Sequence, residues 1–246
     1  MRLYGLIGYP LAQSFSKKYF TEKFSNEGIS DARYELFQIP SISELPDILR
    51  KKDLCGLNVT IPYKKEVLPF LQDMDDEARK MGACNCIKIS PTGRLKGFNT
   101  DAPAFEQSVK LLLQPWHTKA LVLGTGGAAQ AIKYTLDKMG IENKSVSRYP
   151  IEEGFSYAQL NQEVVQSHLL IVNTTPLGSF PKTEAAVPIP YEFLTKQHYL
   201  YDLVYNPAQT LFLKKGQERG TATKNGYDML VGQAELSWKI WNDPAL

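Results

Sequence analysis

The sequence lacks long hydrophobic runs and a strong excess of charge of either sign. No stretch approaches the roughly 18–20 consecutive apolar residues that a membrane-spanning helix needs. The 28 Lys and Arg are scattered among 26 Asp and Glu, which gives a formal net charge of +2. Neither nucleic acid nor an anionic membrane is therefore expected as the main partner. The N-terminal segment MRLYGLIGYP has neither the apolar core nor the cleavage site of a secretory signal, so we expect a cytoplasmic protein.

Residues that hold metal ions or form disulfides are also few. The three cysteines, Cys55, Cys84 and Cys86, cannot all pair, and Cys84 and Cys86 are spaced wrongly for a zinc knuckle. The three histidines are far apart in the sequence. We expect free thiols in a reducing compartment and no bound metal.

The 246 residues alternate short apolar runs with amphipathic segments, which is the pattern of α/β proteins. A boundary near residues 99–102 divides two α/β units, and the length suits two small domains. In the first unit the pattern predicts strands at 3–8, 33–39, 54–61, 84–89 and 94–98, and helices at 16–26 and 75–81. A further helix is expected after a capping box of Ser41 and Glu44.

The second unit repeats the alternation more strictly. The pattern predicts a helix at 127–139 and strands at 120–123, 144–147, 169–172 and 199–204. Residues 120–123 are continuously apolar, as expected of a parallel strand covered on both faces. The last segment, 227–241, is predicted to be helical because Leu230, Ala234, Trp238 and Trp241 are spaced three or four apart.

A glycine-rich turn follows strand 120–123 and opens the next helix. Its residues are Gly124, Thr125, Gly126, Gly127 and Ala128, followed by the small Ala129. In this context the glycines permit a tight turn and the close approach of a pyrophosphate, which the helix N-terminus then binds. A glycine-rich turn without a ligand is the alternative. The spacing favours a dinucleotide site.

The end of strand 144–147 indicates which dinucleotide binds. An NAD site usually places a carboxylate there for the ribose 2′-hydroxyl. This chain instead has Ser147 and Arg148, which can bind a 2′-phosphate by a hydroxyl and a charge-assisted fork. We expect NADP, with NAD left open by Glu152 and Glu153 a few residues later.

Polar residues at strand ends mark the first unit. Asn58 and Thr60 share one face of a strand because strand side chains alternate. Taken singly, these residues also have structural explanations, since Ser16 and Asp101 are good N-caps and Lys64 is an ordinary surface cation. The set comprises Ser14, Ser16, Asn58, Thr60, Lys64, Asn85 and Asp101.

In their order and spacing, these segments resemble the shikimate dehydrogenase family over nearly the whole chain. The first unit carries S-x-S at Ser14, N-V-T-x-P-x-K from Asn58, A-x-N at Ala83 and G-x-N-T-D from Gly97. The second carries G-x-G-G-A from Gly124, N-T-[ST]-P-x-G from Asn173, D-x-x-Y-x-P from Asp202 and G-x-x-M-L-x-x-Q from Gly226.

The resemblance implies an α/β fold with an N-terminal substrate domain, whose sheet is mixed and mostly parallel, and a Rossmann-type, doubly wound dinucleotide-binding domain. The substrate domain is expected at residues 1–101 and the NADP domain at 102–225. The C-terminal helix at 226–246 is expected to pack back on the first domain. The family's activity is the reversible NADP-dependent reduction of 3-dehydroshikimate to shikimate in aromatic amino-acid (chorismate) biosynthesis, by a monomer or homodimer.

The resemblance also implies residue roles. Lys64 and Asp101 would form the catalytic pair, and Leu203 and Gly226 would flank the nicotinamide. Thr174 would join the glycine turn, Ser147 and Arg148 in binding the cofactor. The substrate would be bound by Ser14, Ser16, Asn58, Thr60, Asn85, Tyr205 and Gln233.

Two departures from the family pattern leave alternatives open. Asp101-Ala102-Pro103-Ala104 replaces the frequent D-G-x-G, and Ser147-Arg148-Tyr149 replaces N-R-T. The alternatives are a quinate/shikimate dehydrogenase that uses NAD, a non-catalytic dinucleotide-binding regulator of the same fold, and a dehydrogenase of the methylene-tetrahydrofolate type. Retention of both Lys64 and Asp101 disfavours the regulator, and the S-x-S and N-V-T-x-P-x-K segments disfavour the folate enzyme.

Overall fold

The computed structural model describes residues 1–11 and 14–245, and the chain divides into two compact units. Unit 1 comprises Met1–Thr100 together with Ala234–Leu246, and unit 2 comprises Asp101–Gln233. Leu246, the last residue of the expected C-terminal segment, lies outside the described residues. The chain thus passes between the units once after Thr100 and once inside its last helix, α8 (Tyr227–Asn242).

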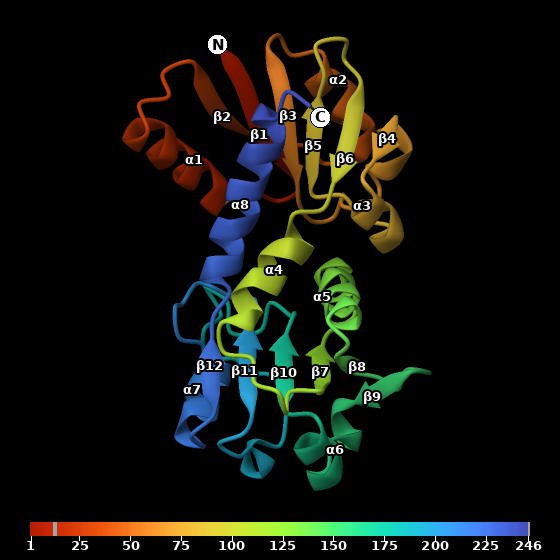
Figure 1. The fold of residues 1–246 in the computed structure, drawn as a ribbon, viewed down its shortest axis with the longest axis vertical. Coiled ribbons are helices and arrows are strands. Elements are labelled where there is room, and N and C mark those ends of the chain that lie inside the picture. Colours follow the sequence, from red (N-terminus) through yellow and green to blue (C-terminus); the bar gives the residue numbers. More distant parts are fainter. Residues whose placement is uncertain (12–13, 246) are drawn as a thin grey trace. The chain divides into compact units, whose positions relative to one another are not determined.

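Unit 1 contains a six-stranded mixed sheet in the order β2-β1-β3-β5-β6-β4 (Figure 1). The pairs β1·β2, β1·β3 and β4·β6 are parallel, and β3·β5 and β5·β6 are antiparallel. The strands are β1 (Arg2–Gly8), β2 (Ala32–Gln38), β3 (Leu54–Val59), β4 (Asp73–Met74), β5 (Cys86–Ile89) and β6 (Leu95–Phe98).

Helices cover both faces of this sheet because the strands alternate apolar side chains between the faces. On one face, Leu3 and Ile7 of β1 pack with residues of α2 (Leu45–Leu49). On the other, Tyr4 and Leu6 pack with aromatic side chains of α1 (Phe15–Asn26) and with the unit 1 part of α8. The short α3 (Asp76–Met81) begins at Asp75, whose side chain accepts a hydrogen bond from the Ala78 N–H.

Trp241 fastens α8 to the sheet. Its ring stacks on Tyr4 with the centroids 4.8 Å apart, and its Nε1 donates to the Ile87 carbonyl at 3.0 Å. A Cβ at position 56 of β3 would lie 2.3 Å from that nitrogen, so glycine is required there. The end of α8 is therefore part of the core of unit 1.

Unit 2 contains six parallel strands in the order β12-β11-β10-β7-β8-β9 (Figure 1). Counted along the chain this order is 3-2-1-4-5-6, the arrangement of Rossmann-type sheets, and it confirms the predicted fold class. The strands are β7 (Lys119–Leu123), β8 (Glu142–Ser147), β9 (Gly154–Ser156), β10 (Leu170–Asn173), β11 (Tyr199–Asp202) and β12 (Ala222–Lys224).

The remaining helices belong to unit 2: α4 (Asp101–Lys110), α5 (Gly127–Lys138), α6 (Gln162–Ser167), α7 (Leu211–Glu218) and the beginning of α8. Pro103 is accommodated in the first turn of α4, where backbone N–H groups have no partner within the helix. Within the described residues, every helix is too short or too polar to cross a lipid bilayer.

Several element boundaries differ from the prediction for local reasons. The strand expected at 54–61 ends at Val59, because a turn closed by the Tyr63 N–H on the Thr60 carbonyl follows at once. Ser41 does not form the expected capping box with Glu44. Its hydroxyl accepts from the Ser43 N–H and caps a 3₁₀ turn, Ile42–Glu44, that leads into α2.

Candidate active-site residues in the two units

One edge of the unit 1 sheet gathers the polar residues that the sequence singled out there. The carboxyl ends of β1 and β3 lie at this edge together with the start of β5, which runs antiparallel to β3. Ser14 and Ser16 follow β1, Thr60 and Lys64 follow β3, and Asn85 precedes β5. Topology alone therefore brings these five residues to the same edge.

Lys64 is carried by a short, well-anchored segment after β3. The neighbouring Tyr63 is buried and donates its hydroxyl to the Ile39 carbonyl at 2.6 Å. The carbonyl of Lys64 accepts from the Cys84 N–H at 2.8 Å. The half-buried Lys64 side chain therefore extends from a backbone that is fixed on both sides.

Ser14 offers a buried hydroxyl. It is the N-cap residue of α1, but its side chain makes no capping hydrogen bond. Its Oγ is inaccessible to solvent and has no hydrogen-bond partner among the described residues. A buried polar atom left in this state is rare in folded proteins, and a ligand group is one way to satisfy it.

Asn85 and Asn58 are both buried at the same edge but differ in whether a side-chain N–H remains for a ligand. The Asn85 Oδ1 accepts from the Thr100 N–H at 2.7 Å, and its Nδ2 donates to the Thr100 hydroxyl at 3.0 Å. No described residue accepts its second Nδ2 hydrogen. Both Nδ2 hydrogens of Asn58 are used, on the Asn85 carbonyl at 3.3 Å and on Ser237 Oγ at 2.8 Å. Asn85 retains a donor for a ligand, and Asn58 does not.

In unit 2 the residues expected to bind the cofactor follow the carboxyl ends of the parallel strands. Gly124 follows β7, Arg148 follows β8, Thr174 follows β10, Leu203 follows β11 and Gly226 lies just after β12. In open α/β sheets this edge is where ligands bind, next to the point where the strand order reverses. Here the reversal lies between β7 and β10.

The glycine turn has the geometry of an anion site. Gly124 has φ +116°, and a Cβ there would lie 2.6 Å from the Thr174 hydroxyl, which itself donates to the Leu123 carbonyl at 2.7 Å. The N-cap residue of the twelve-residue α5 is Gly126, so no capping side chain covers the N–H groups of the first turn. A Cβ at Gly126 or Gly127 would meet no atom within 4 Å. The first turn of α5 is thus open to an approaching phosphate.

The loop after β8 presents one cation. The Ser147 hydroxyl accepts from the Tyr149 N–H at 3.2 Å and donates to the Tyr149 carbonyl, so it shapes the turn. Arg148 is exposed and forms no ion pair with a described residue. Tyr149, which follows it, is 74% exposed. Arg148 is therefore available to a phosphate, while the Ser147 hydroxyl is engaged by the backbone of Tyr149.

Leu203 and Gly226 lie against each other. A Cβ at position 226 would be 2.2 Å from the Leu203 carbonyl oxygen, so only glycine fits. The Gly226 N–H donates to the Val204 carbonyl at 3.2 Å, and the Leu203 N–H to the Asn173 carbonyl at 2.9 Å. The two residues expected beside the nicotinamide are therefore neighbours.

Asp202 supports the loop that carries Leu203. It was not predicted as a site residue, although it is the first residue of the D-x-x-Y-x-P segment. It is fully buried. Its carboxylate accepts from Asn173 Nδ2 at 2.9 Å, the Val204 N–H at 3.0 Å and the Thr210 hydroxyl at 2.6 Å. Burial raises the pKa of Asp202 to about 6, against the opposing effect of these donors.

The other three expected residues, Asp101, Tyr205 and Gln233, also belong to unit 2. Asp101 is the first residue of α4 and is half-buried. Burial raises the pKa of the Tyr205 hydroxyl. Gln233 lies on α8, where its Nε2 donates to the Leu230 carbonyl at 3.1 Å.

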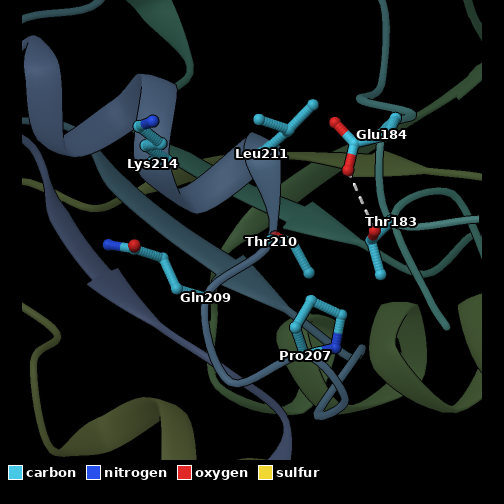
Figure 2. A pocket seen from close by; sticks show the side chains of 7 residues that line it. All are labelled: Thr183, Glu184, Pro207, Gln209, Thr210, Leu211 and Lys214. Carbon is cyan, nitrogen blue, oxygen red and sulfur yellow. Dashed lines mark hydrogen bonds between the residues drawn. The ribbon is translucent and has the colours of Figure 1, made fainter.

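A separate cavity of about 250 Å³ opens beside the start of α7 (Figure 2). Thr183 donates a hydrogen bond to Glu184 at 3.2 Å on one side, and Lys214 lies on the other. None of the expected site residues lines it. The lining residues are Thr183, Glu184, Pro207, Gln209, Thr210, Leu211 and Lys214.

Comparison with known proteins identifies relatives along the whole chain. A model of the shikimate dehydrogenase substrate binding domain matches residues 6–87. A shikimate dehydrogenase (NADP(+)) of Geobacillus kaustophilus (strain HTA426) is 34% identical over 260 residues, which cover 98% of this chain and 92% of that protein.

Solved structures agree with this comparison. The chorismate mutase/shikimate 5-dehydrogenase fusion protein from Clostridium acetobutylicum has 37% identity and a TM-score of 0.87, covering 99% of this chain and 92% of the other. The shikimate 5-dehydrogenase of Thermus thermophilus, in complex with NADP(H) and shikimate, has 30% identity and a TM-score of 0.85, covering 100% and 96%.

Proposed function

The chain belongs to the shikimate dehydrogenase family, and from this premise we propose that it catalyses the reversible NADP-dependent reduction of 3-dehydroshikimate to shikimate. It is then an oxidoreductase that acts on a CH–OH group in the synthesis of aromatic amino acids. Unit 1 binds the substrate and unit 2 binds NADP. Location in the cytoplasm, and assembly as a monomer or homodimer, stay predictions from the sequence.

One observation carries the proposal for the substrate: the edge of unit 1 offers hydrogen-bond donors that no described residue accepts, next to an anchored lysine. The buried Ser14 hydroxyl and the remaining Nδ2 hydrogen of Asn85 suit the carboxylate and ring hydroxyls of a polyhydroxy acid. Ser16, Thr60, Tyr205 and Gln233 are proposed to complete the binding set. Asn58, whose two Nδ2 hydrogens are both used, is proposed to hold this edge in place.

Lys64 and Asp101 are proposed as the catalytic pair. In the direction of ketone reduction, the Lys64 ammonium donates a proton to the oxygen that becomes the hydroxyl, and in the reverse direction the amine accepts it. Asp101 orients Lys64 and exchanges the proton with it. NADP, when bound, supplies the redox chemistry of hydride transfer.

The residues of unit 2 fit this cofactor. The open first turn of α5, beside Gly124–Ala128, binds the pyrophosphate through backbone N–H groups. Arg148 binds the 2′-phosphate that distinguishes NADP from NAD. Leu203 and Gly226 are proposed to flank the nicotinamide, and Thr174 to bind the cofactor beside the glycine turn. Ser147 fixes the turn that presents Arg148.

The test is a set of four assays of the purified protein: shikimate or quinate, each with NADP or NAD. Formation of reduced cofactor is followed by absorbance. We expect turnover to be fastest with shikimate and NADP. Turnover only with quinate and NAD would overturn both the substrate and the cofactor, and turnover in none of the four would indicate a non-catalytic dinucleotide-binding protein.

A further inference from the structure

A continuous chain of buried hydrogen bonds runs through unit 1 beneath the proposed substrate edge. At one end, the buried Tyr34 hydroxyl donates to Asn58 Oδ1 at 2.9 Å. Asn58 Nδ2 continues the chain to Ser237 Oγ at 2.8 Å. The Ser237 hydroxyl lies 3.4 Å from that of Thr100, which is bonded to Asn85.

This chain links Asn85, a proposed substrate residue, to the interior of unit 1 through side chains that do not take part in the proposed reaction. The orientation of the Asn58 amide within it is fixed, because the Asn85 carbonyl can only accept and must therefore face Nδ2.

Ser237 is the member that α8 contributes. Its side chain is fully buried, four residues after Gln233. Without this hydroxyl, Asn58 would keep a buried N–H with no acceptor in place. Leaving a buried donor unpaired costs more than a hydrogen bond contributes on average, so the amide would shift to find another partner.

Loss of the Ser237 hydroxyl would affect the proposed substrate site through Asn58 and through Thr100. Asn58 donates to the backbone carbonyl of Asn85, and Thr100 holds the Asn85 side-chain amide through both its N–H and its hydroxyl. Thr100 is also the residue directly before Asp101. We propose that Ser237 is a positioning residue, which orients Asn85 for the substrate through Asn58 and Thr100. This inference rests on the proposed function.

The experiment compares Ser237→Ala with the wild type in the shikimate and NADP assay. We expect the KM for shikimate to rise about ten-fold, the order expected from one unpaired buried donor, and the KM for NADP to stay within about two-fold. Ser156→Ala is the matched control, since it removes another buried serine hydroxyl, bonded to Gln159 at 3.0 Å in unit 2. It should leave the KM for shikimate unchanged.

A second variant, Thr100→Val, removes the next hydroxyl while keeping the size of the side chain. It should raise the KM for shikimate to a similar extent, and combining it with Ser237→Ala should add little, because both break the same chain. An unchanged KM for shikimate in Ser237→Ala, or an equal rise in both KM values, overturns the positioning role. A wild type that does not turn over shikimate overturns the proposed function instead.

Discussion

Asp202 is expected to make the stability of the protein depend on pH in a definite direction. Its pKa is raised from the ordinary 3.8 to about 6 because the carboxylate is buried. The folded chain therefore binds this proton more tightly than the unfolded chain does. The contribution to stability is fully present below pH of about 4 and is lost as pH rises through about 6. A pKa difference of about 2 corresponds to about 3 kcal/mol.

Asp202→Asn removes the charge and preserves the shape. Both the Asn173 amide and the Val204 N–H donate to the same oxygen, Oδ1, while only the Thr210 hydroxyl donates to Oδ2. An asparagine can keep Oδ1 in place and donate its Nδ2 to Thr210, whose hydroxyl can turn to accept. At pH 8 we expect the variant to be more stable than the wild type by up to about 3 kcal/mol, and at pH 4 about equally stable.

The assay is urea unfolding followed by circular dichroism between pH 4 and 8. Glu106→Gln is a control of opposite sign, because a hydrogen bond from Lys110 lowers the pKa of Glu106. That variant should be less stable than the wild type by a nearly constant amount from pH 8 down to about 5, because the contribution of a carboxyl with a lowered pKa is lost only below its ordinary value of 4.5. Parallel stability curves for wild type and Asp202→Asn across the whole range would refute the reasoning.

Variants at the glycine turn and at Arg148 test unit 2. Gly126→Ala should leave the free energy of unfolding unchanged but raise the KM for NADP, since its Cβ enters open space where the pyrophosphate is proposed to bind. Gly124→Ala should instead lower the free energy of unfolding by about 1–3 kcal/mol, because φ at position 124 is +116°. A destabilised Gly126→Ala with unchanged KM would contradict this. Arg148→Ala should raise the KM for NADP at least ten-fold and leave the KM for NAD nearly unchanged, as measured by initial rates. Arg148→Lys should have a KM for NADP between those of the wild type and Arg148→Ala. Equal effects on both cofactors would exclude a 2′-phosphate contact.

Local sequence signals were enough to predict the strand, glycine turn and helix at which the cofactor is proposed to bind. A continuous apolar strand, a glycine turn and a helix start follow each other between residues 120 and 129, and the structure has β7, the Gly124 turn and α5 there. The short strands β4, β9 and β12 were missed, since two or three residues carry no periodicity to detect.

The supporting residues could not be predicted, because their roles depend on contacts between distant segments. Ser237 lies on a helix that was predicted from its apolar spacing, but its partners Asn58 and Thr100 lie 179 and 137 residues away. Asp202 lies in one of the segments that resemble the family. Its role could not be predicted, because it depends on hydrogen bonds from Asn173 in β10 and from Thr210, the N-cap residue of α7. The roles of Lys64 and Asp101 rest on family resemblance and stay proposals.

The turnover of Lys64→Ala tests the central claim most directly, with shikimate and NADP as substrates. Loss of a general acid–base group should lower kcat by roughly 10² or more, while the binding of NADP to unit 2 stays as in the wild type. Lys65→Ala, which removes the adjacent exposed lysine, should retain wild-type kcat. Near wild-type turnover in Lys64→Ala would contradict the assignment of this lysine as the proton donor.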